Sequence, residues 1–131
     1  MKRGYALKIE DAPVYHGMGE DYSGVTSRVL IDGESGCMFR GTFQPGGYHA
    51  RHIHRDSDEF VYIISCGKAL KGLGDEIYEM EPGMCFCVPK NTVHWMKNLD
   101  ETTPIEVVGV FPDALDIDHT GYEYVGKIHA R

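Results

Sequence analysis

Three histidines lie close together in the stretch HARHIHRDSDEF, which spans residues 49–60. His52 and His54 are two residues apart, so on a β-strand their side chains project from one face, with Cα atoms roughly 6.5–7 Å apart. Imidazoles spaced in this way can converge on one metal ion, whereas a ligand pair on a helix needs a spacing of four residues. The pair is therefore either part of a metal site or two solvent-facing histidines, and its spacing alone leaves both open.

The same stretch also offers carboxylates as a further ligand. Asp56, Ser57 and Asp58 have the composition of a turn, and Glu59 begins the apolar run EFVYIIS. A hairpin would bring Glu59 back beside His54, which makes it the better candidate. Asp58 remains an alternative, and the ordinary role of Glu59 would be a strand-edge charge that limits unwanted pairing.

Short runs rich in β-branched and aromatic residues recur along the chain, and turn residues separate nearly all of them. This pattern is typical of an antiparallel sandwich or barrel. Residues 112–118 could hold one helical turn, and residues 1–22 and 119–131 are expected to form arms or added strands. The predicted strands are 24–32, 37–44, 48–54, 59–65, 68–73, 76–81, 84–89, 93–98 and 104–111.

The stretch GGYHARHIHRDSDEFVYIISCG resembles the first sequence motif of the cupin superfamily. That motif is a glycine, five residues, His-x-His, three or four residues, a glutamate, six residues and a glycine. Gly46, His52, His54 and Glu59 match it. Gly67 follows Glu59 by seven residues instead of six, which predicts a bulge or a shifted turn.

The stretch GMCFCVPKNTVHWMKN resembles the second cupin motif, a glycine, five residues, Pro-x-Gly, two residues, a histidine, three residues and an asparagine. Gly83, Pro89, His94 and Asn98 match it. Asn91 replaces the motif glycine, and asparagine tolerates the positive φ that such a turn requires. The two motifs together cover roughly residues 46–98.

This resemblance implies an all-β fold, a double-stranded β-helix or jelly-roll barrel. We expect one cupin domain over residues 1–131, with a core at about 24–111 and arms at both ends. The resemblance also implies one metal ion bound by His52, His54, Glu59 and His94, since spacing alone does not bring His94 to the others. Three imidazoles and one carboxylate suit Fe(II), Mn(II), Ni(II), Co(II) or Zn(II).

Strand alternation suggests which other side chains reach the metal. It places Tyr48 on the face of His52, and His49 and Arg51 on the opposite face, unless a bulge intervenes. Tyr48 is therefore a candidate catalytic residue, as a pocket acid or hydrogen-bond donor, although a packed aromatic is its ordinary role. Arg40 is a second candidate, beside Arg28 and Gln44 on the early strands, because an inward side chain could hold a substrate carboxylate, although a solvent-facing arginine is the ordinary case.

Three functions are compatible with these residues, and in one of them the metal is purely structural. The first is a metal-dependent enzyme that acts on a small oxygenated metabolite, as a dioxygenase, isomerase, lyase or cyclase. The second is a non-catalytic module that binds a sugar or another small ligand and uses the metal as an anchor. The fold alone does not choose between them, because cupins host many reactions on similar sites.

Composition excludes several partners. The chain has 131 residues, 20 acidic against 13 basic, and a net charge of −7, which disfavours nucleic acid. No apolar stretch approaches the roughly 18 residues of a membrane span, and the start lacks the apolar run of a signal peptide. The four cysteines form no CxxC pair, so we expect reduced thiols in a cytoplasmic protein.

The run FVYII is apolar on both faces, which predicts a homodimer.

Overall fold

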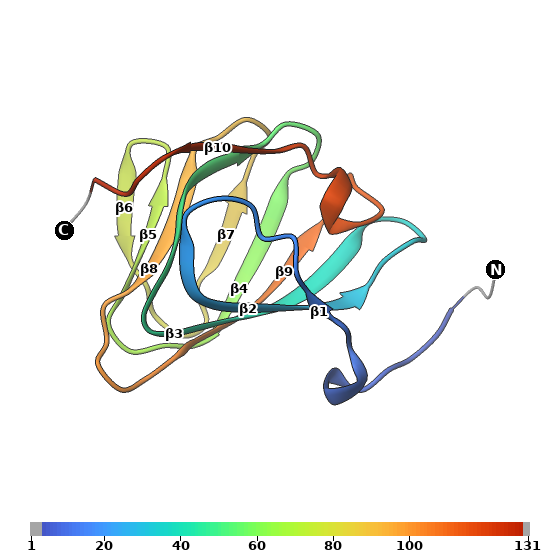
Figure 1. Ribbon diagram of the computed structural model, residues 1–131, viewed down its shortest axis with the longest axis horizontal. Helices are drawn as coiled ribbons and strands as arrows, with labels where there is room; N and C mark the ends of the chain where they lie inside the picture. The colour runs from blue at the N-terminus through green and yellow to red at the C-terminus, as the bar shows by residue number, and fades with distance from the viewer. Residues whose placement is uncertain (1–3, 130–131) are drawn as a thin grey trace.

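Short antiparallel strands make up most of the computed structural model, which describes residues 4–129 (Figure 1). Two short 3-10 helices, η1 (Ile9–Asp11) and η2 (Ile117–His119), lie near the two ends of the chain. None of the helices within residues 4–129 is long and apolar enough to cross a membrane. The strands of this part of the chain are β1 (Val14–Tyr15), β2 (Tyr22–Ile31), β3 (Cys37–His54), β4 (Glu59–Ser65), β5 (Ala69–Leu73), β6 (Glu76–Glu79), β7 (Cys85–Val88), β8 (His94–Asn98), β9 (Ile105–Phe111) and β10 (Tyr122–Gly126).

One long strand, β3, connects the two sides of the curled sheet. Its first half, residues 37–43, pairs with β9, and its second half pairs with β8 and β10. The strand order is β6-β5-β8-β3-β9-β4-β7, with β2 and β10 paired to β3 and β1 paired to β2. The sheet therefore wraps around its own inner face, which is the jelly-roll architecture expected from the motifs (Figure 1).

Alternation along the strands builds the core. In β4, Val61 and Ile63 are buried while Phe60 and Tyr62 are exposed, and β9 alternates in the same way. The inward residues of both sides pack into one cluster, which removes apolar surface from water and stabilises the barrel. The buried members are Phe43, Val61, Ile63, Ala69, Met80, Phe86, Met96, Ile105 and Val107.

The predicted strands are confirmed in kind, with one difference in their number. Residues 37–44 and 48–54 were expected as two strands, but β3 runs through the Pro-Gly-Gly between them. Gly46 takes a φ of 77°, so the chain can bend there without ending the strand. The tail forms the added strand β10, and η2 lies at the end of the segment where a helical turn was expected.

Two local deviations from the cupin motifs have the expected structural outcome. Asn91, at the motif glycine position, takes a φ of 64°. The pairing of β4 with β9 shifts register between Ile63 and Ser65, which accommodates the additional residue before Gly67. Both motif turns therefore survive in this chain despite the changed residue and the changed spacing.

Candidate metal centre

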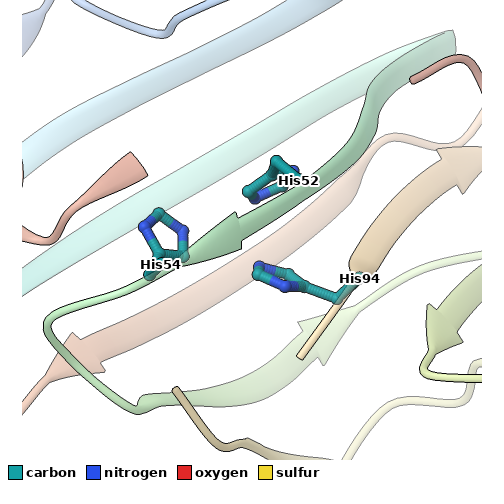
Figure 2. Close-up of side chains that lie close together, drawn as sticks. All are labelled: His52, His54 and His94. Carbon is teal, nitrogen blue, oxygen red and sulfur yellow. The ribbon is translucent and has the colours of Figure 1, made fainter. Parts of the chain in front are cut away.

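Three buried histidines from two neighbouring strands converge inside the barrel. His52 and His54 project from the end of β3, and His94 projects toward them from the start of β8 (Figure 2). His52 and His94 are direct partners in the antiparallel register. One ring nitrogen from each of the three lies within 4.8 Å of those of the other two. The three side chains could therefore bind one metal ion.

Backbone carbonyls orient two of these imidazoles. Nδ1 of His52 lies 2.7 Å from the carbonyl oxygen of Ala50, and Nδ1 of His94 lies 3.0 Å from that of Thr92. A carbonyl only accepts, so each Nδ1 carries the proton. The Nε2 lone pair of each ring is then left for a metal, which is the usual arrangement of histidine ligands.

A buried threonine orients the third imidazole. Thr120 is fully buried, and its hydroxyl donates to the carbonyl oxygen of Ile117 at 3.1 Å. The same oxygen lies 2.8 Å from Nδ1 of His54. Because the hydroxyl proton is already engaged, Nδ1–H of His54 is the donor in this contact. All three histidines therefore present Nε2 as an acceptor.

Glu59, the first residue of β4, completes the group. Its Oε1 lies 3.0 Å from Nε2 of His94, but the two atoms lack hydrogen-bond geometry and have no other hydrogen-bond partner in the described chain. Both atoms are buried, so their contact needs a cation between them, either a proton on Nε2 or a bound metal ion. The donor set therefore fits a metal ion, although Glu59 lies outside the three-histidine group whose ligand atoms are all mutually within 4.8 Å.

Burial determines the charge state of the site. Loss of solvent lowers the pKa of His54 to about 4 and holds the pKa of His52 well below its ordinary value. Burial alone would raise the pKa of Glu59, but the nearby His94, His54 and Lys71 lower it further than burial raises it, to about 2. At neutral pH the site therefore combines neutral His52 and His54 with the carboxylate of Glu59, as metal binding requires.

Acidification is expected to destabilise the metal-free protein. Between pH 6.5, the ordinary pKa of histidine, and about pH 4, His54 stays neutral in the fold but becomes protonated in the unfolded chain. The unfolded state then binds more protons, so stability falls as the pH falls. We expect the melting temperature of chelator-treated protein to drop by at least about 5 °C between pH 7 and pH 5. The melting temperature of the variant His54→Asn should drop by less over the same pH range. A wild-type melting temperature that is the same at pH 7 and pH 5 would contradict the neutral state assigned to His54.

His49 lies inside the cavity, and its predicted outward orientation is wrong. In the pairing of β3 with β8, His49 faces Met96 and His52 faces His94, so three steps on β3 match two on β8. This bulge reverses the alternation between His49 and His52. The two rings stack with centroids 4.1 Å apart, and Nε2 of His49 is buried without a hydrogen-bond partner in the described chain.

The two candidate catalytic residues lie outside the cavity. Tyr48 has the opposite orientation to His49, and its hydroxyl donates to Oδ1 of Asp21 at 2.9 Å. Arg40 alternates with the cavity-lining residues of β3 and forms an ion pair with Glu106 at 3.1 Å. Tyr48 therefore points outward and not inward as expected. Arg40 also points away from the cavity, and it pairs with Glu106 on the outer face of the barrel.

The cavity beside the histidines has a volume of about 110 Å³. Tyr15 from the N-terminal segment and Thr120 and Tyr122 from the C-terminal segment line it, so both arms help to enclose the site. Lys71 on β5 also lines it and was missed in the sequence. The only signal was a charged residue between apolar neighbours in the run ALKGL.

Comparison with known proteins agrees with this geometry. Residues 39–111, more than half of the chain, match the family model described as a cupin domain. The chain belongs to the cupin family. A mannose-1-phosphate guanylyltransferase of Salmonella muenchen is 30% identical over 82 residues, which are 63% of this cupin and 17% of that enzyme. The chain thus spans only a small part of that curated relative.

Solved structures share the fold of this cupin. The polyketide cyclase RemF from Streptomyces resistomycificus superposes with a TM-score of 0.75 at 18% identity, covering 98% of this chain and 88% of that one. Pac13, a Streptomyces nucleoside dehydratase, superposes with a TM-score of 0.69 at 19% identity, covering 96% and 94%. At this level of identity the likeness establishes the cupin fold alone.

Proposed function

We propose that this cupin is a metal-dependent enzyme in which His52, His54, His94 and Glu59 bind one divalent ion of Fe, Mn, Ni, Co or Zn. The observation that carries the proposal is the oriented donor set. Nδ1 of each of the three imidazoles is held by a hydrogen-bond acceptor, which leaves Nε2 for the metal, beside a buried carboxylate oxygen without a hydrogen-bond partner in the described chain. Imidazole and carboxylate ligands suit these ions better than a closed thiolate site would.

The substrate we infer is a small oxygenated metabolite, in keeping with the size of the cavity. When bound, the metal would supply Lewis acidity toward a carbonyl or carboxylate oxygen. Burial lowers the pKa of His49 to about 4, so this cavity-lining imidazole is neutral at pH 7, and its Nε2 has no hydrogen-bond partner in the described chain. It is therefore suited to a hydrogen bond with the substrate rather than to proton transfer.

The test has a metal part and a turnover part. Chelator-treated protein is titrated with each of the five ions, and bound metal is measured by plasma mass spectrometry; we expect one ion per chain. Small hydroxy acids, keto acids and sugars are then screened by thermal shift, and each stabilising compound is followed by mass spectrometry. Absence of metal binding would overturn the proposed site. Stabilisation without any product would favour the binding module over the enzyme.

The terminal segments are proposed to belong to the same domain as the motif region. β1 pairs with β2, and β10 pairs with the part of β3 that carries His52 and His54. The arms thus extend the same sheet that holds the site. The four cysteines are unpaired in the structure, which is compatible with the proposed cytoplasmic location.

A homodimer through the outer face of β4 is the assembly we propose. Phe60, Tyr62 and Ile64 are each at least 40% exposed there, and Phe60 and Tyr62 lie beside Val110 and Val108 of β9. A second copy would cover this apolar strip. Light scattering is expected to give twice the mass of the 14.7-kDa chain, and Tyr62→Lys is expected to give a monomer. A matched substitution on β6, Ile77→Lys, should stay dimeric; a monomeric wild type would refute the proposal.

A further inference from the structure

Lys71 places a cationic side chain on the inner face of the barrel, close to the histidines. It is only 3% exposed and lines the same cavity. In the pairing of β5 with β8, Leu73 faces His94 and Lys71 faces Met96. Lys71 is therefore the diagonal neighbour of His94 on one face of the sheet, a relation with Cα atoms about 7–8 Å apart. A lysine side chain can reach across such a distance toward a molecule bound at the histidines.

The Lys71 ammonium has no paired group of opposite charge. None of the hydrogen bonds or ion pairs found among residues 4–129 involves its Nζ, which lies 6.0 Å from the ring centroid of Phe86. Glu59 is the one carboxylate among the described residues that line the cavity, and it forms no ion pair with Lys71. A buried ammonium without a close anion is unfavourable. The position of Lys71 therefore calls for an anionic partner.

The charge balance of the cavity also favours an anionic ligand. When a metal is bound its imidazole ligands are neutral, and the carboxylate of Glu59 and the ammonium of Lys71 cancel. A divalent ion held by Glu59 would leave the cavity with two positive charges in excess. Charges in a poorly solvated cavity interact more strongly than in water, so an anionic ligand would be favoured there.

We propose that Lys71 binds an anionic oxygen group of the substrate, so that the metal-loaded cavity selects small carboxylates and related oxygen anions over neutral molecules. This inference rests on the proposed metal site and adds the substrate class to it. Lys71 would act as the second contact for the anion through a charge-assisted hydrogen bond. The other role open to Lys71 is purely structural, as a cation packed over Phe86.

The test compares an anionic and a neutral ligand on Co(II)-loaded protein. Acetate and imidazole are titrated separately, and their dissociation constants are read from the visible absorption of the cobalt. In Lys71→Met we expect acetate to bind at least about 10-fold more weakly, while imidazole stays within about 2-fold of wild type. Lys97→Met, which removes one positive charge from the half-buried Lys97 outside the cavity lining, should change neither constant.

The outcomes separate this inference from the metal site itself. If Lys71→Met binds Co(II) and acetate as wild type does, the inference is wrong and the metal site stands. If the wild type binds none of the five candidate ions, the proposed function fails, and this inference fails with it. Lys71→Gln is the second variant, should Lys71→Met not fold, and the same loss of acetate affinity is expected of it.

Discussion

Replacing His94 by alanine is expected to lower the affinity for the divalent ion by at least about 100-fold. His94 is 2% exposed and lies opposite His52 in the register of β3 and β8, with Nε2 3.0 Å from Glu59. The variant loses the imidazole that lies between the two histidines of β3 and the carboxylate of Glu59. Affinity is measured by titration of chelator-treated protein, with bound metal checked by plasma mass spectrometry.

The carboxylate ligand is tested by an isosteric change. Glu59→Gln keeps the shape of the side chain but removes its charge, so the remaining site would hold a divalent ion with neutral ligands alone. We expect a comparable loss of affinity. Asp58→Asn is the matched control, because Asp58 is the other acid beside the strand and its carboxylate accepts from the backbone N–H of Lys90. Loss of metal in Asp58→Asn but not in Glu59→Gln would show that Asp58, and not Glu59, is the carboxylate ligand.

The fold could be predicted because its signals are local. Glu59–Ser65 forms a strand with the predicted bounds, since a short run of β-branched and aromatic residues follows a turn there. Asn91 takes the positive φ that its place in the motif requires. These features depend on residues within one strand or one turn, so a single sequence contains the information.

The contents of the cavity were harder to predict, because they depend on register. One bulge between His49 and His52 turns His49 inward and Tyr48 outward, and no residue type in that stretch marks its position. A shift by one residue exchanges the two faces of a strand, so every inference based on alternation beyond the bulge is reversed. Lys71 was missed for a related reason, because its burial comes from strands far away in the sequence.

The contact between Thr120 and His54 had no sequence signal at all. The two residues are 66 positions apart, and Thr120 lies in the tail that was expected to form an arm or an added strand, without a role in the site. The pairing of β10 with β3 brings the segment onto the strand of the histidines, with Tyr122 opposite His54. The C-terminal arm is therefore part of the metal centre, and a chain cut back to the two motifs would lack the contact of Thr120 with His54.

Substitution of Thr120 by valine is expected to weaken metal binding by about 10- to 100-fold while the protein stays folded. Valine has nearly the same shape, but it removes the oxygen that accepts Nδ1–H of His54 at 2.8 Å. The His54 ring then loses the contact that fixes its orientation and its tautomer, and a buried donor is left unpaired. Metal titration at constant pH measures the affinity, and circular dichroism checks the fold.

Thr120→Ser separates orientation of His54 from simple packing. Serine keeps the hydroxyl that donates to the carbonyl of Ile117 and accepts from His54, but it lacks the methyl group. If the hydroxyl orients His54, Thr120→Ser retains a metal affinity near that of wild type. If Thr120 only packs, serine is the more damaging change, because valine preserves the volume of the side chain. A valine variant that melts at a lower temperature yet binds metal as tightly as wild type would restrict Thr120 to a structural role.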